Sequence, residues 1–94
     1  MQEKLYRIKP GYMIENIAGK YVLMAPAVGD IDYSKMLVLS ESAVFIVNKL
    51  MEGNDNFFSL LDALLAEYNV KEKQAREELT AFLLKLEGLN VFEN

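Results

Sequence analysis

The chain has 94 residues, no cysteine and no histidine, and a formal net charge of −4. This length fits a single domain, residues 1–94, with a modest core, and the lack of cysteine excludes disulfides and thiolate metal sites. Without histidine, the most common general base and metal ligand is missing, so we expect no enzyme, no metal site and no cofactor. The N-terminal residues contain no long apolar run, so we expect a cytoplasmic protein without a signal peptide or membrane span.

Charge is distributed unevenly along the chain. Residues 1–35 contain five basic and four acidic residues, whereas residues 36–94 contain five basic and ten acidic ones. Proteins that contact nucleic-acid phosphates gather Lys and Arg on one surface. The acidic second part therefore argues against a nucleic-acid partner.

The first part of the chain has the pattern of a small antiparallel sheet. Lys9-Pro10-Gly11 is a turn signal, because proline fixes φ and glycine tolerates positive φ. Two runs rich in β-branched and aromatic residues, 12–17 and 20–25, flank Ala18-Gly19 and predict a hairpin. The short apolar run 36–39 predicts a third strand.

From Ser40 onward the apolar residues recur at helical spacing, which predicts three helices. The first begins after the N-cap Ser40 and ends before Gly53. The second begins near Asp55-Asn56 and runs to Tyr68, and the third extends to Gly88. We therefore predict an α+β fold of order β-β-β-α-α-α, in which a three-stranded antiparallel sheet precedes a three-helix bundle in a winged-helix-like arrangement.

The third predicted helix has the most regular apolar stripe. The side chains expected to face the core are Ala75, Leu79, Phe82 and Leu86. Glu72 and Arg76 stand one turn apart and are expected to form a surface ion pair.

Sequence motifs for catalysis or metal binding are missing. There is no glycine-rich phosphate loop, no Ser/His/Asp set and no metal-ligand spacing. Asp30 and Asp32 form a carboxylate pair in a predicted loop, which we interpret as a solvated turn because a hard cation needs more fixed oxygen ligands.

Several short motifs follow one another at characteristic distances. They are Lys9-Pro10-Gly11, Leu39-Ser-Glu-Ser-Ala43, Gly53, Tyr68-Asn-Val70 and Phe82-Leu-Leu-Lys-Leu-Glu-Gly-Leu89. Through their order and spacing, nearly the whole chain, from about Ile8 to Phe92, resembles the PqqD family. The namesake of that family is a small accessory protein of pyrroloquinoline quinone biosynthesis.

The resemblance implies a non-catalytic recognition element that binds the leader segment of a ribosomally made precursor peptide. Such an element presents the peptide to a modifying enzyme, often a radical S-adenosylmethionine enzyme. The family pattern implies that the leader adds as a strand to the third strand, in the groove beside the third helix. An added strand would satisfy the unpaired N–H and C=O groups of a sheet edge.

Carried onto this sequence, the resemblance gives a set of candidate peptide-binding residues. On the third strand they are Lys35, Met36, Leu37, Val38 and Leu39, and on the third helix Arg76, Thr80 and Leu83. Strand geometry puts Met36 and Val38 on one face and Leu37 and Leu39 on the other, and the sequence leaves open which face meets the groove. Arg76 and Lys35 are candidates to pair with acidic leader residues, or are solvated surface cations.

The chain departs from the family pattern at a few positions. Residues 32–35 lack an Asn-Gly before the third strand, 54–56 lengthen the loop between the first two helices, and Lys71 replaces a capping residue. These departures leave open which peptide, partner enzyme and pathway the chain serves.

Two other functions use the same fold. A winged-helix DNA-binding regulator needs a basic recognition helix, but the third helix region carries four basic and four acidic residues between Lys71 and Glu87. A protein–protein adaptor that reads no peptide would use the same open edge and apolar groove. Homodimerisation through the sheet edge is a further expectation for the unliganded protein.

Overall fold

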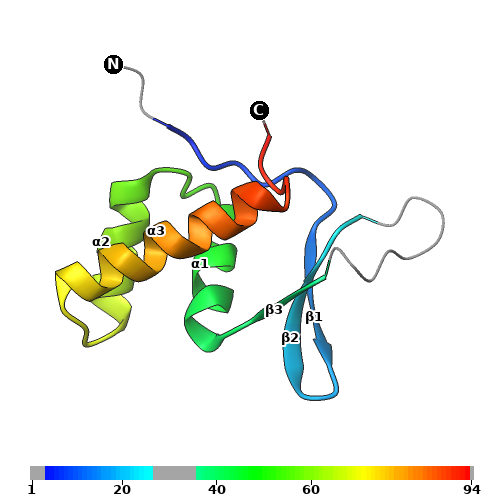
Figure 1. The fold of residues 1–94 in the computed structure, drawn as a ribbon, viewed down its shortest axis with the longest axis horizontal. Coiled ribbons are helices and arrows are strands. Elements are labelled where there is room, and N and C mark those ends of the chain that lie inside the picture. The colour runs from blue at the N-terminus through cyan, green and yellow to red at the C-terminus, as the bar shows by residue number, and fades with distance from the viewer. Residues whose placement is uncertain (1–3, 27–35, 94) are drawn as a thin grey trace.

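The computed structural model describes residues 4–26 and 36–93. Its elements follow the order β-β-β-α-α-α, so the predicted α+β fold is confirmed (Figure 1). They are β1 (Met13–Ile17), β2 (Lys20–Met24), β3 (Leu37–Leu39), α1 (Glu41–Met51), α2 (Phe57–Glu67) and α3 (Glu72–Gly88). No helix in the described part of the chain is long and apolar enough to cross a membrane.

The three strands form an antiparallel sheet with β2 in the centre. Val22 of β2 lies opposite Glu15 of β1 on one side and Val38 of β3 on the other. Because side chains alternate along a strand, Leu37 and Leu39 share one face, and the burial of Leu39 shows that this face meets the core. Val38 points to the opposite face and is 61% exposed.

The hairpin between β1 and β2 turns at Ala18-Gly19, as predicted. Both residues have positive φ, 53° and 85°, as a type I′ turn requires. The Asn16 side-chain oxygen accepts a hydrogen bond from the Gly19 amide at 3.1 Å. Alanine is unusual here because its Cβ is crowded in the left-handed region.

Because the left-handed backbone at Ala18 is strained, we expect Ala18→Asn to stabilise the protein. Asparagine tolerates left-handed φ, and Asn-Gly is a favoured type I′ pair, so the free energy of unfolding should rise by about 0.5–1 kcal/mol. Urea denaturation measures the change. Ala18→Val is the control: valine is β-branched and disfavours left-handed φ, so this variant should be less stable than the wild type. Equal stability of the two variants would contradict the turn assignment.

Side-chain and backbone caps set the ends of α1 and the start of α2. The Ser40 hydroxyl accepts a hydrogen bond from the Ala43 amide at 3.2 Å, and Gly53, at φ 101°, ends α1. The Asn56 side chain accepts from the Phe58 and Ser59 amides at 2.8 and 3.1 Å. These caps are the ones that the sequence predicts.

The two ends of α3 are closed in different ways. Lys71 stands at the N-cap and makes no side-chain capping bond, as its replacement of a capping residue predicted. The helix ends at Gly88, as predicted, and two residues later Asn90 takes the left-handed conformation at φ 60°. The Val91 amide then donates to the Leu86 carbonyl at 3.2 Å, a bond that satisfies a free carbonyl of the last turn.

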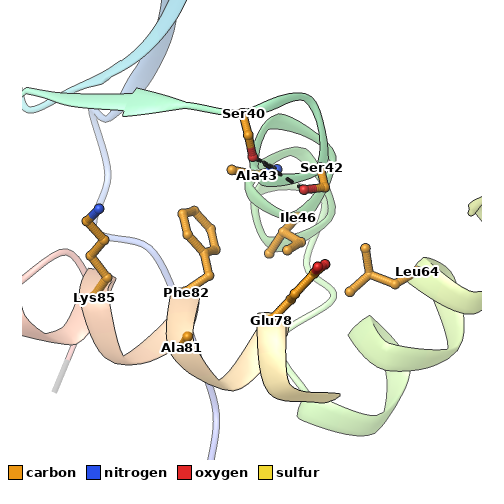
Figure 2. Close-up of a pocket in the computed structure, with 9 residues that line it drawn as sticks. All are labelled: Ser40, Ser42, Ala43, Ile46, Leu64, Glu78, Ala81, Phe82 and Lys85. Carbon is orange, nitrogen blue, oxygen red and sulfur yellow. Dashed lines mark hydrogen bonds between the residues drawn. The ribbon is translucent and has the colours of Figure 1, made fainter. Parts of the chain in front are cut away.

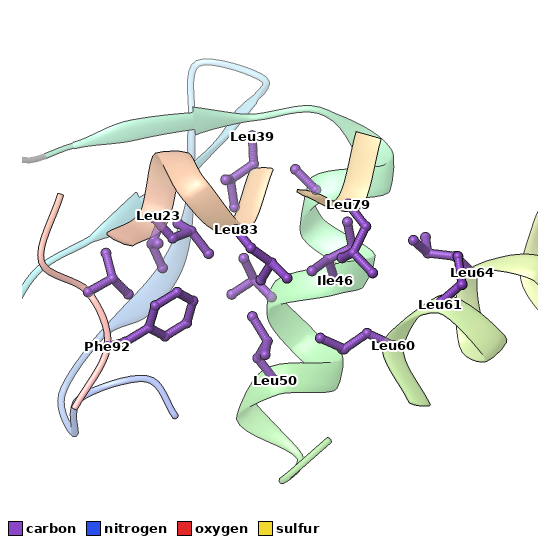
Figure 3. Packing of buried hydrophobic residues seen from close by; sticks show 14 of the residues in the cluster. Leu23, Leu39, Ile46, Leu50, Leu60, Leu61, Leu64, Leu79, Leu83 and Phe92 are labelled. Atoms are coloured by element: carbon purple, nitrogen blue, oxygen red, sulfur yellow. The ribbon is translucent and has the colours of Figure 1, made fainter. Parts of the chain in front are cut away.

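One contiguous core joins the sheet to all three helices (Figure 3). Its buried members are Leu23, Leu39, Ala43, Ile46, Val47, Leu50, Leu60, Leu61, Leu64, Ala75, Leu79, Leu83, Leu86, Val91 and Phe92. In Figure 1, α3 crosses α1 and its C-terminal end lies toward the sheet, whereas α2 lies on the side of α1 away from the sheet. The core therefore fixes α3 and α1 relative to β3.

The two ends of the described chain pack together across this core. Ile8 and Phe92 form a β-bridge, and the Tyr6 and Phe92 rings meet edge to face with centroids 5.4 Å apart. Val91 and Phe92 are buried, so the apolar residues after α3 fold back on the core.

Candidate functional site: the β3 edge and the groove between α1 and α3

The open edge of the sheet is the first part of the candidate site. Among the described residues, β3 pairs only with β2, so its other edge has unpaired N–H and C=O groups. The chain leaves this strand at Ser40 and enters α1 directly. The exposed edge and the start of α1 are therefore held next to each other.

A groove of about 400 Å³ lies at this junction, and we call it the α1–α3 groove (Figure 2). Its lining residues are Ser40, Ser42, Ala43, Ile46, Leu64, Glu78, Ala81, Phe82 and Lys85. They come from the β3–α1 junction, α1, α2 and α3. The groove is therefore built from elements that the core positions rigidly.

The middle of the groove is apolar. Ala43 and Ile46 are buried beneath it, and Phe82 projects from α3 toward the start of α1 (Figure 2). Phe82 is partly exposed although it also packs against the core. An incoming apolar side chain could therefore bury itself against this ring.

Polar groups lie around the apolar centre. Figure 2 shows Glu78 and Lys85 on α3 to either side of Phe82. The Ser40 and Ser42 hydroxyls, 3.3 Å apart, lie across from them on the α1 side. Within the described part of the chain Glu78 and Lys85 form no ion pair, and the Glu78 carboxylate accepts a hydrogen bond from the Gln74 side-chain Nε2 at 3.2 Å.

The structure places the predicted strand residues at this site only in part. Leu37, Val38 and Leu39 form β3, whereas Met36 precedes the strand and Lys35 lies outside the described residues. Leu39 is buried and Leu37 half-buried on the core-facing side. The question left open by the sequence is thereby answered for β3 itself: Leu37 and Leu39 face the helices, and Val38 faces away.

The predicted helix residues do not line the α1–α3 groove. Leu83 is 2% exposed and belongs to the core, so its assignment to the groove wall is wrong. Arg76 and Thr80 line a different depression of about 510 Å³, which we call the α2–α3 hollow, together with Phe57, Glu77, Ala81 and Leu84. Arg76 forms the predicted pair with Glu72 at 3.8 Å and lies over the Phe58 ring.

Leu83 was assigned to the groove wall because the apolar stripe of α3 was taken to face the core through Phe82. Phe82 and Leu83 are neighbours and lie about 100° apart around the helix. The sequence stripe placed Phe82 inside and Leu83 at its flank, whereas the structure buries Leu83 and leaves Phe82 at the groove. The polar groove residues Glu78 and Lys85, which sequence reasoning missed, share the face of Phe82 because they are one turn away on each side.

The site offers binding surfaces but no recognisable reactive group. Among residues 4–26 and 36–93 there is no cluster of three or more Asp, Glu, His or Cys side chains that could hold a metal ion. No buried side-chain nitrogen or oxygen in that part of the chain lacks a hydrogen-bond partner. What the arrangement provides is an open strand edge beside an apolar groove, which is the geometry for adding a peptide strand.

Comparison with known proteins agrees with this description. The family model of coenzyme PQQ synthesis protein D (PqqD) matches residues 20–91. The chain belongs to the PqqD family. The resemblance inferred from the sequence motifs is thereby confirmed. The matched region of this PqqD-family chain contains β2, β3 and all three helices.

Two solved structures share the fold. One is TbiB1 in complex with the TbiA(beta) leader peptide, with a TM-score of 0.71 and 24% identity over 94% of this chain and 95% of that one. The other is lasso peptide synthetase B1 complexed with the leader peptide, with a TM-score of 0.66 and 22% identity over 93% of this chain and 94% of that one. No curated protein matches this chain.

Proposed function

We propose that this chain is a non-catalytic adaptor that binds the leader segment of a ribosomally made precursor peptide and presents it to a modifying enzyme. The observation that carries the proposal is the open β3 edge leading directly into the α1–α3 groove. A peptide strand added at that edge would satisfy the free backbone groups of β3. Its alternate side chains would enter the groove near Phe82.

The family and the two structural neighbours support this proposal. The chain is a PqqD-family member, and both neighbours are complexes with leader peptides. A radical S-adenosylmethionine enzyme is the kind of modifying enzyme that we propose as partner. Homodimerisation through β3 would use the same edge, so leader binding and dimerisation should compete.

The charges of α3 favour leader binding over the DNA-binding alternative. The helix contains three basic and four acidic residues, and Arg76 is paired with Glu72 on the face away from the α1–α3 groove. A phosphate-binding helix would gather unpaired cations on one face. We therefore use duplex DNA as a comparison ligand in the test below.

The test is a fluorescence-anisotropy titration with synthetic leader segments from short reading frames beside the gene. We expect one leader to saturate the protein while its sequence-scrambled version does not. Binding should change little between 50 and 200 mM salt, because contacts to phosphates are what make affinity fall steeply over about this range. Failure of every leader, together with tight and salt-sensitive binding of duplex DNA, would overturn the proposal.

A further inference from the structure

Glu78 and Lys85 give the α1–α3 groove opposite charges on the two sides of an apolar centre. Neither has an ionic partner within the described part of the chain, although both line the groove. A ligand that covered these charges without offering counter-charges would remove their water at a cost in free energy. The groove therefore favours a ligand whose own charges are opposite and placed to match.

We infer that the groove selects an extended peptide segment with a basic, an apolar and an acidic residue at alternate positions, in that order from N to C. This inference deepens the proposed function and rests on it. The basic residue would face Glu78, the apolar residue Phe82 and the acidic residue Lys85. The intervening residues would point away from the groove.

The spacing of the three helix residues fits alternate positions of a strand. Glu78, Phe82 and Lys85 are separated by about one helical turn each, or about 5.4 Å along the axis. Residues two apart in a strand are separated by about 6.8 Å and share a face. Over two steps the mismatch is about 3 Å, and the long side chains at the two outer positions can absorb it.

The direction follows from how β3 and α3 lie along the groove. Figures 1 and 2 show β3 running toward the start of α1 while α3 runs the opposite way, so Lys85 lies nearer the β3 side and Glu78 beyond Ser40. Antiparallel pairing is slightly more stable per residue than parallel pairing. A strand antiparallel to β3 passes Glu78 first and Lys85 last.

The experiment is a selection from a displayed library of random 12-residue peptides. The baits are the wild-type protein, the charge-swapped variant E78K/K85E and a matched control, E77K/K73E. The control makes the same two substitutions on the same helix and keeps the net charge. However, Glu77 lines the α2–α3 hollow and Lys73 lines neither depression.

We expect the wild type and the control to enrich basic-x-apolar-x-acidic peptides and the charge-swapped variant to enrich acidic-x-apolar-x-basic ones. A peptide selected on the wild type should bind E78K/K85E about tenfold more weakly, since two partly exposed ion pairs are lost. Its charge-reversed version should recover that loss.

Two results would contradict the inference in distinguishable ways. Enriched peptides that compete with a leader but carry no charge pattern, or the same pattern on all three baits, overturn the charge selection and leave leader binding intact. If the wild type enriches no peptide and binds no leader, the proposed function itself fails, and the inference fails with it.

Discussion

Leu83→Ala is expected to lower the free energy of unfolding by about 3 kcal/mol. Leu83 is 2% exposed and lies among core side chains of the sheet and helices (Figure 3). Truncation removes buried methyl groups and leaves a cavity that a packed core fills only partly. In a domain of this size the melting temperature should fall by more than about 10 °C.

The neighbouring residue provides the control for this prediction. Leu84 is also a leucine and is the next residue in the same helix, but its side chain is 61% exposed. Leu84→Ala should therefore change the free energy of unfolding by less than about 0.5 kcal/mol. Urea denaturation of both variants measures the difference. Equal losses would mean that α3 is rotated about its axis from the orientation described above.

Phe82→Ala is expected to weaken leader binding by at least about tenfold, because Phe82 has the largest apolar side chain among the residues that line the groove. The partial exposure of Phe82 predicts a smaller loss of stability than for a fully buried phenylalanine. Anisotropy titration at a temperature where circular dichroism shows the variant folded separates the two effects.

Phe58→Ala is the matched control for the binding prediction. Phe58 is also an aromatic residue that is partly exposed, at 57%, but it lies in α2 against Arg76, away from the α1–α3 groove. We expect its loss to leave leader affinity within about twofold of wild type, as is common for residues outside an interface. If Phe58→Ala weakened binding as much as Phe82→Ala, the peptide would contact the exposed surface of α2 near Arg76 and not the α1–α3 groove.

Local chemistry made most of the fold predictable from the sequence. Ser40 and Asn56 cap helices by hydrogen bonds within three residues along the chain, and Ala18-Gly19 turns a hairpin between adjacent strands. Such features depend on short stretches of chain, so the sequence contains their cause. The left-handed Asn90 was missed because Gly88, two residues earlier, is the more usual helix terminator.

The candidate site was less predictable because it depends on packing between distant elements. The third strand was predicted, and the structure forms it at Leu37–Leu39. The orientation of α3 was less predictable, because an apolar stripe shows which residues seek the core without showing which flank meets β3. Choosing between Phe82 and Leu83 for the core required their packing partners on the sheet and α1, which lie far away in the sequence.

The most direct test of leader binding at β3 is to map the amide chemical shifts of isotope-labelled protein during titration with a leader that binds. We expect the largest changes in Leu37–Leu39, at Ser40–Ala43 and along α3 from Glu78 to Lys85. Residues of the α2–α3 hollow that are remote from this groove, such as Phe57 and Arg76, should change little. Changes centred on Phe57 and Arg76, with β3 unaffected, would contradict strand addition at the open edge.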